Sequence, residues 1–143
     1  MEIEFLGRKK KPVCDKVIVF SENGRKYEAK NPNEKSVLKI HVDGDLITSG
    51  ERCDFTLDVI DEKNLYLVEL KGCDKAHAFE QLLATMDYMK GKGLERIYFP
   101  RIVVSKDAAP NIKSAAEKRM ERLVNTHKCE KCVVSTRFYS ESI

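Results

Sequence analysis

The sequence contains no hydrophobic run approaching the roughly 20 apolar residues that a membrane-spanning helix needs. The polar start Met1-Glu2-Ile3-Glu4 lacks the apolar segment of a signal peptide. Internal repeats, low-complexity tracts and linkers rich in Pro, Gly or Ser are also absent from the sequence. We therefore expect a cytoplasmic protein that forms one domain over residues 1–143 and has no membrane partner.

The five cysteines are odd in number, which favours reduced thiols in a cytosolic protein over a disulfide framework. Cys129 and Cys132 have the Cys-x-x-Cys spacing of half a tetrahedral zinc site, but the sequence has no second pair of this kind. We interpret them as two free thiols in a turn between a helix and a strand, with zinc binding as the alternative.

The net charge of +3 is a mild basic excess, and it does not by itself identify a polyanionic partner. Basic residues cluster in several places, but Glu95, Glu117 and Glu121 are interspersed among them. Most of these clusters are therefore expected to be solvated helix and loop faces.

Hydrophobic periodicity and turn residues predict the order of the elements. They are a hairpin over 17–20 and 25–29, a strand or hairpin over 36–47, strands at 55–60 and 65–70, a helix from Asp74 to Gly91, a strand over 96–104, a helix opening at Pro110 or Asn111, and a strand over 132–139. Pro100 places its strand at an edge or a bulge. This order predicts an α/β fold in which a mixed β-sheet is flanked by helices, with the core over about residues 36–139.

The tripeptide Glu69-Leu70-Lys71 ends one apolar run, and Asp54 precedes the apolar run before it. Residues two apart on a strand share a face, so Glu69 and Lys71 are expected to project together. If residues 61–64 form the turn between antiparallel strands, Thr56 lies opposite Glu69 and Asp54 lies opposite Lys71. Asp54 is then diagonal to Glu69 on the same face, and a slip of one residue would send it to the other face.

Asp58 is the competitor to Asp54 for the place beside Glu69. In the same register it lies diagonal to Glu69 from the other side. Position favours Asp54, because Asp54 precedes the apolar part of its strand. Asp58 could replace or assist Asp54, or it could be a polar residue at an exposed position of the sheet.

The segment 52–55, a short turn, the segment 66–72 and a following helix and strand resemble the PD-(D/E)xK nuclease superfamily, which includes many restriction enzymes and Holliday-junction resolvases. The resemblance covers about residues 36–105 and implies a restriction-endonuclease-like fold. It implies that Asp54 and Glu69 are metal ligands and that Lys71 is the catalytic lysine. Cys53 stands where a proline is common in that family.

The resemblance also bears on two residues outside the central motif. His77, Gln81 and Thr85 fall four residues apart on a stripe of the expected helix beside its apolar one. Some members of the superfamily place a glutamine on the helix after the motif, which implies a role for Gln81 among these three; the alternative is a polar residue at the edge of a core helix. An early helix that often contributes another glutamate is not evident, which leaves only Glu34 as a weak candidate.

Phosphodiester hydrolysis needs a nucleophilic water and charge stabilisation at the phosphate, and Mg²⁺ held by one or two carboxylates supplies much of both. Asp54, Glu69 and the main-chain carbonyl of Leu70 are the candidate ligands, and Mn²⁺ can substitute. Lys71 can orient the attacking water or stabilise the phosphate. The sequence thus predicts a Mg²⁺-dependent endonuclease that cleaves nucleic acid, with DNA favoured over RNA.

We expect cleavage to be structure-selective or weakly sequence-specific, because a chain of this size has few additions for reading a long site. A homodimer could supply a second half-site. The alternative is a module on the same fold that binds nucleic acid or a protein without hydrolysing anything. Neither the substrate structure nor the pathway follows from the sequence.

Overall fold

The computed structural model describes residues 1–42, 52–70, 74–106 and 113–143. Within these ranges the chain forms ten strands and two helices. Their bounds are β1 Ile3–Phe5, β2 Arg8–Lys10, β3 Val17–Glu22, β4 Arg25–Lys30, β5 Val37–His41, β6 Phe55–Val59, β7 Asn64–Glu69, α1 Lys75–Gly91, β8 Ile97–Val104, α2 Ala115–Val124, β9 Val133–Thr136 and β10 Phe138–Ser142. The part of the expected hairpin that falls after residue 42 lies outside the described residues.

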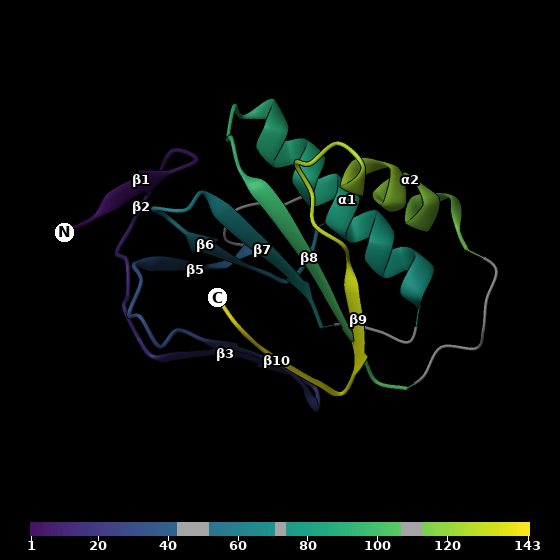
Figure 1. The fold of residues 1–143 in the computed structure, drawn as a ribbon, viewed down its shortest axis with the longest axis horizontal. Coiled ribbons are helices and arrows are strands. Elements are labelled where there is room, and N and C mark those ends of the chain that lie inside the picture. The colour runs from purple at the N-terminus through teal and green to yellow at the C-terminus, as the bar shows by residue number, and fades with distance from the viewer. Residues whose placement is uncertain (43–51, 71–73, 107–112) are drawn as a thin grey trace.

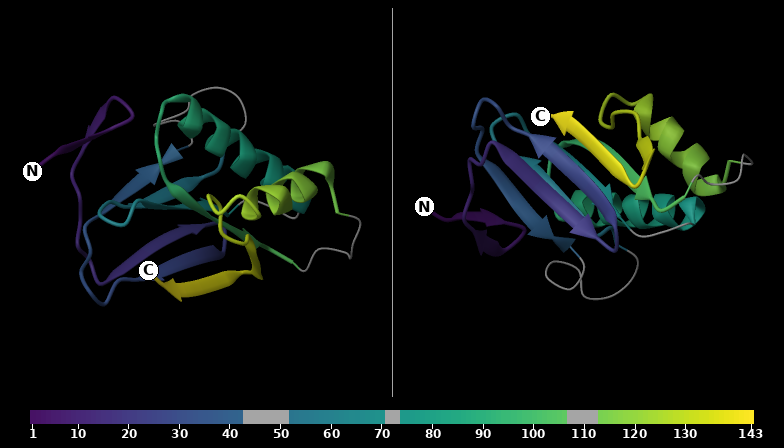
Figure 2. Two further views of the ribbon diagram at one scale, coloured as in Figure 1. Left: turned by 45° about the horizontal axis from the view of Figure 1, so that its top comes forward. Right: turned by 90° about the horizontal axis from the view of Figure 1, so that it is seen from below.

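A five-stranded sheet in the order β5-β6-β7-β8-β9 forms the centre of the fold. Its first three strands pair antiparallel and its last two join in parallel, so the sheet is mixed and the predicted α/β class is confirmed. Both helices cover one face of this sheet (Figure 1). The opposite face is covered by a three-stranded sheet in the order β10-β4-β3, and not by a further helix (Figure 2).

The central sheet divides the core into two apolar layers. The layer on the helix side takes Leu65 and Leu67 from β7 together with the buried stripe of α1. The layer on the other side takes Tyr66 and Val68 from the same strand and packs them against the small sheet. Alternate residues of β7 thus face different layers, as the period of two in a strand requires.

Helix α1 begins where the sequence predicts it. The Asp74 side chain accepts the backbone N–H of His77 at 3.1 Å, which satisfies one of the donors that an N-terminus leaves open. Helix α2 begins later than predicted, at Ala115. Ser114 caps it, because its hydroxyl accepts the N–H of Glu117. Residues 107–112 lie outside the described part of the chain.

The expected hairpin at Asn23-Gly24 is present as β3 and β4. Both turn residues have positive φ, 49° at Asn23 and 80° at Gly24, as a two-residue turn matching the strand twist requires. The hairpin does not join the central sheet. It pairs instead with β10 in parallel, through contacts between residues more than 100 positions apart in the chain.

The prediction of one final strand over 132–139 is wrong. The structure has two strands separated by Arg137, which takes a left-handed φ of 64°. The Arg137 N–H donates to Val104 of the central sheet at 2.7 Å, and its carbonyl accepts the N–H of Lys26 in the small sheet at 2.9 Å. This residue turns the chain out of one sheet and into the other.

Pro100 lies on β8, which has a neighbour on each side and is not an edge strand. Of the two predicted positions, the edge is excluded, and the bulge agrees with the irregular pairing on the β9 side of this residue. Tyr98 bridges Cys129, whereas Arg101 pairs with Val133, so one extra residue separates these pairs on the β9 side. A proline without an N–H fits such a bulge.

No helix in the described ranges is both long and apolar enough to cross a membrane.

Two buried tyrosines make the stability of the fold sensitive to alkaline pH. Burial raises the pKa of Tyr66 and the pKa of Tyr98 to about 12, from an ordinary value of 10.0. Each phenol then stays protonated in the folded chain at pH values where it ionises in the unfolded chain. The stabilisation is complete below pH 10, and about 1 kcal/mol per tyrosine is lost by pH 11 as the pH rises toward 12.

Urea unfolding at pH 9 and at pH 11 measures this loss. Tyr98→Phe is expected to reduce the difference in unfolding free energy between the two pH values by about 1 kcal/mol. An undiminished difference in this variant would show that Tyr98 does not contribute.

Candidate active site

The β6–β7 pairing brings Asp54 and Glu69 together. Phe55 pairs with Val68 and Thr56 with Leu67, so the next step of the ladder sets Asp54 directly opposite Glu69. The predicted register, with Thr56 opposite Glu69, is wrong by two residues. A shift of two keeps every side chain on its face, so the two carboxylates still lie on the same side of the sheet and stand closer than the diagonal pair that was predicted.

The register differs because Asn64 belongs to β7 and not to the turn. Its backbone is paired with Val59 on one side and with Ile97 on the other, which extends the strand by one residue at its start. The turn is therefore 60–63, and Lys63 closes it with a left-handed φ of 55°. Pairing on both sides outweighs the preference of asparagine for turns.

Both carboxylates face the helix-covered side and are removed from solvent. Asp54 is 2% exposed and Glu69 is 0% exposed. On this face they lie in a row across the sheet between Val42 of the chain following β5 and Ile102 of β8. Two carboxylates that lie opposite each other offer oxygen ligands of the kind that a hard divalent cation takes.

Backbone contacts fix the position of Asp54. Its carbonyl accepts the N–H of Val42 at 3.0 Å, which continues the β5–β6 pairing by one residue. Its Oδ2 accepts the N–H of Leu70 at 2.8 Å, which ties the carboxylate to the end of β7. The second contact links two of the predicted ligands directly, because the Leu70 carbonyl belongs to the same residue.

Helix α1 supports the site through Thr85. The Thr85 hydroxyl accepts the N–H of Cys53 at 2.8 Å and donates to the carbonyl of Gln81 at 2.9 Å. Burial and the nearby charge of Glu69 raise the pKa of the Cys53 thiol far above its ordinary range. Cys53 is therefore a neutral, buried neighbour of the carboxylates, and Thr85 is a residue that the sequence placed on the right stripe of the helix without assigning it a role.

Thr85→Val is expected to lower the free energy of unfolding by about 1–3 kcal/mol, because it leaves the buried N–H of Cys53 without an acceptor. Thr56→Val is the matched control. Thr56 is equally buried, and its hydroxyl has no hydrogen-bond partner in the described part of the chain, so this change is expected to be neutral or stabilising. Urea unfolding of both variants is the measurement, and equal losses would contradict the assigned role of Thr85.

Asp58 does not join Asp54 and Glu69. It lies opposite Leu65, four residues along β6 from Asp54, which corresponds to about 13 Å of strand. Arg96 binds both of its carboxylate oxygens, at 2.7 and 3.0 Å. The structure thus gives Asp58 a buried ion-pair partner at the other end of the sheet, and the choice of Asp54 over Asp58 agrees with this geometry.

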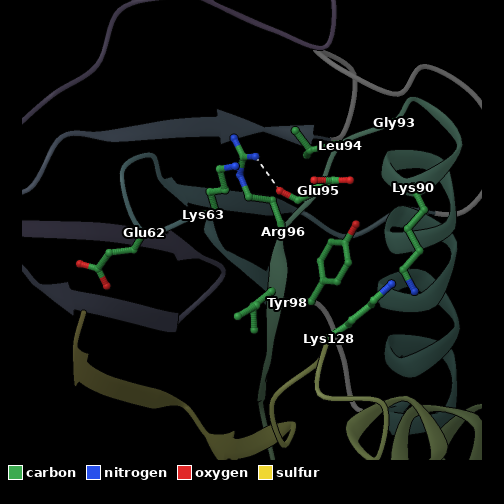
Figure 3. Close-up of a pocket in the computed structure, with 10 residues that line it drawn as sticks. Glu62, Lys63, Lys90, Gly93, Leu94, Glu95, Arg96, Tyr98 and Lys128 are labelled. Atoms are coloured by element: carbon green, nitrogen blue, oxygen red, sulfur yellow. Dashed lines mark hydrogen bonds between the residues drawn. The ribbon is translucent and has the colours of Figure 1, made fainter.

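A cavity of about 780 Å³ lies at that far end, next to Arg96 (Figure 3). Lys90 and Lys128 point toward one another beside the Tyr98 ring, and the Lys90 Nζ lies 5.5 Å from the ring centroid. The carboxylates that line this cavity belong to Glu62 and Glu95, which are both exposed. This cavity therefore lacks the buried carboxylate pair that distinguishes the Asp54 end.

The remaining predicted residues fall in different places. Lys71 lies outside the described residues. Gln81 is half-buried one helical turn before Thr85, on the same side of α1. Glu34 is exposed in the turn before β5, and Val37 at the start of that strand pairs with Val59, so Glu34 lies at the end of the sheet away from Asp54.

The Cys-x-x-Cys pair lies on the helix side, away from the carboxylates. Burial raises the pKa of Cys129 to about 11 and that of Cys132 to about 12, so both thiols are protonated at neutral pH. The Cys129 Sγ lies 3.9 Å from the Met120 sulfur within the core. Among residues 1–42, 52–70, 74–106 and 113–143, no group of three or more His, Cys, Asp or Glu side chains is placed to hold a metal ion.

Comparison with protein-family models, with curated proteins and with solved structures gave no match to this chain.

Proposed function

We propose that the protein is a metal-dependent nuclease that hydrolyses phosphodiester bonds in nucleic acid, on a restriction-endonuclease-like core built from β5–β8 and α1. The observation that carries this proposal is the pair of buried carboxylates, Glu69 at the end of β7 and Asp54 directly before β6, which the pairing of the two strands sets opposite each other. A strand pair that ends in two aligned acids, followed in sequence by a lysine, supplies the groups that metal-assisted phosphodiester hydrolysis uses.

The donor atoms suit Mg²⁺, with Mn²⁺ as a substitute. Asp54 and Glu69 offer carboxylate oxygens and Leu70 offers a main-chain carbonyl next to both, and hard divalent cations take oxygen ligands of these kinds. Mg²⁺ is typically held by one or two carboxylates with waters in its other positions, so two acids are sufficient. A bound ion would supply a nucleophilic water and charge stabilisation at the phosphate.

Lys71 is the proposed partner of the carboxylates. It follows Glu69 by two residues, so an extended chain would present it on the same face. In this role the ammonium group orients the attacking water or stabilises the phosphate charge. Gln81 is proposed as a further residue of the site, because it lies one helical turn from Thr85, whose hydroxyl holds the residue before Asp54.

The proposed substrate is DNA in preference to RNA, cleaved with structural or weak sequence selectivity, and the protein can act as a monomer or a homodimer. The test is a cleavage assay on single-stranded, duplex and branched DNA and on RNA of the same sequence, with Mg²⁺, Mn²⁺ or EDTA. Cleavage that requires a divalent metal is the expected result. Tight binding without cleavage in either metal would replace this proposal with a non-catalytic binding module.

A further inference from the structure

The cavity of about 780 Å³ next to Arg96 is built by three separate elements (Figure 3). Lys90 comes from the last turn of α1, Tyr98 from β8 and Lys128 from the segment between α2 and β9. The backbone N–H of Tyr98 donates to the carbonyl of Lys128 at 2.9 Å, which ties that segment to the strand. The backbone therefore holds these three side chains in fixed places around one cavity.

The Tyr98 hydroxyl is a buried donor without an acceptor. Tyr98 is 1% exposed, and its phenol oxygen has no hydrogen-bond partner in the described part of the chain. Figure 3 shows its ring between Arg96 and Lys90, with the hydroxyl directed toward Leu94 and Glu95, which also line the cavity. A buried hydroxyl that lacks an acceptor costs free energy, so an acceptor atom of a ligand at this place would be favourable.

The positive charges available at the cavity belong to lysines. The Arg96 guanidinium is already bound to both carboxylate oxygens of Asp58. Lys90 and Lys128 form no ion pair with any residue that the structure describes, and their ammonium groups point toward one another. The Lys90 Nζ also lies 5.5 Å from the centroid of the Tyr98 ring. Two ammonium donors and one hydroxyl donor thus border the same cavity.

The acidic residues of the cavity do not balance these lysines. Glu62 is bound to Lys35 outside the cavity, with 2.6 Å between the charged atoms. Glu95 is exposed and is the other acid among the lining residues that the structure describes. Lys63 lines the cavity as well, so three lysines face the carboxylate of Glu95. The charge balance favours an anionic ligand.

The donors and the walls of the cavity suit a phosphate ester. A phosphate monoester carries a charge of about −1.5 to −2 at pH 7 and three acceptor oxygens, and lysine is a common phosphate binder. Leu94, Ile97 and the Tyr98 ring supply apolar surface for an organic group. The volume lies within the range of about 300–1,000 Å³ that is typical of small-molecule sites, so a phosphate ion alone would leave most of it unfilled.

We propose that this cavity binds a phosphate monoester whose organic group has the size of a nucleoside, with the phosphate held by Lys90, Lys128 and the Tyr98 hydroxyl. The same chemical group occurs in free nucleotides and at the 5′ end of a nucleic-acid strand, and the test separates these two sources. The site is distinct from the carboxylate pair, and its assignment does not rest on the proposed function.

Calorimetric titration of the full chain with 5′-AMP, adenosine and inorganic phosphate tests the site, in EDTA so that no divalent metal contributes. AMP is expected to bind more tightly than either fragment, because only AMP uses both the lysines and the apolar wall. Lys90→Gln is expected to weaken AMP binding about tenfold, from the loss of a charge-assisted hydrogen bond. Lys128→Gln is expected to do the same.

Lys92→Gln is the matched control. Lys92 is an exposed lysine at the end of the same helix, and its Nζ lies 5.6 Å from the centroid of the Tyr88 ring, but it does not line the cavity. This variant is expected to keep the AMP affinity within about twofold. Glu95→Gln should change it in the opposite direction to Lys90→Gln, because it removes a negative charge.

Tyr98→Phe tests the hydroxyl. It is expected to weaken AMP binding about threefold to tenfold without lowering the free energy of unfolding at pH 7, because the hydroxyl has no partner in the described chain. The phosphate site would be overturned by AMP that does not bind at millimolar concentrations, by adenosine that binds as tightly as AMP, or by equal effects of Lys90→Gln and Lys92→Gln. An unchanged AMP affinity in Tyr98→Phe would overturn it as well.

Oligonucleotides with a 5′-phosphate or a 5′-hydroxyl separate the two sources of the group. Tighter binding of AMP than of the phosphorylated oligonucleotide identifies a free small molecule, and the reverse order identifies a strand end; both orders support the phosphate site. If AMP binds and no nucleic acid is cleaved, the proposed function alone fails. If metal-dependent cleavage occurs and AMP does not bind, the phosphate site alone fails.

Discussion

Glu69→Gln is expected to lower the rate of Mg²⁺-dependent cleavage by about 10²–10³-fold or more, and Asp54→Asn is expected to do the same. Each change keeps the size of a buried side chain and removes one negative charge from the pair that would hold the cation. Single-turnover cleavage at saturating protein measures the rate, and calorimetric titration with Mg²⁺ measures the loss of metal affinity. Mn²⁺ is expected to rescue only part of the activity, because it needs the same oxygen ligands.

The loss of cleavage should occur in a folded protein. Gln has nearly the size and shape of Glu, so the packing around the buried residue 69 is kept. Urea unfolding of Glu69→Gln is therefore expected to show the same cooperative transition as the unchanged chain. Asp87→Asn is the control, because Asp87 is an exposed residue that pairs with Arg119 on the helix side. A Glu69→Gln variant that cleaves at the original rate in Mg²⁺ would rule out the carboxylate pair as the catalytic centre.

The face of the sheet on which a residue lies and the exact pairing of two strands have different origins in this chain. Only the face could be predicted from the sequence. The two-residue period of a strand decides which face a side chain takes, and Asp54 and Glu69 stay on one face in any register that shifts by two. The register itself depends on where the turn begins, and here Asn64 joins the strand because β8 pairs with it from the other side. A partner supplied by a distant segment is invisible to local patterns.

The same limit explains the second sheet. The hairpin of β3 and β4 was predictable from Asn23-Gly24, but its partner β10 comes from the other end of the chain. The left-handed turn at Arg137 directs β10 to this hairpin, and it contains no glycine or asparagine from which the turn could be predicted. Likewise, the hydrogen bond from Cys53 to Thr85 joins a loop to a helix 32 residues away, so Thr85 could be placed on a stripe but not given its contact.

Glu141→Ala is expected to lower the free energy of unfolding by about 3–5 kcal/mol, because Glu141 joins the two sheets through a buried ion pair. Arg101 on β8 donates to both of its carboxylate oxygens, at 2.7 and 3.0 Å, and the Tyr27 hydroxyl on β4 donates to it at 2.8 Å. Burial lowers the pKa of Arg101, but the hydrogen bonds to Glu141, the charge of Glu141 and the nearby tyrosines together raise it more, so the guanidinium stays charged.

Removing the carboxylate leaves the Arg101 guanidinium, which is only 8% exposed, and the fully buried Tyr27 phenol without this acceptor. The guanidinium does not lose its proton, so the cost of an unpaired buried charge remains in full. Glu141→Gln keeps one acceptor and is expected to lose less. Asp87→Ala breaks an exposed ion pair and should change stability by only about 0.5 kcal/mol. Urea unfolding at pH 7 ranks the three variants. If Glu141→Ala loses no more unfolding free energy than Asp87→Ala, the ion pair does not hold the two sheets together. The apolar layer between them, which includes Val103, Leu57 and Ile18, would then be sufficient.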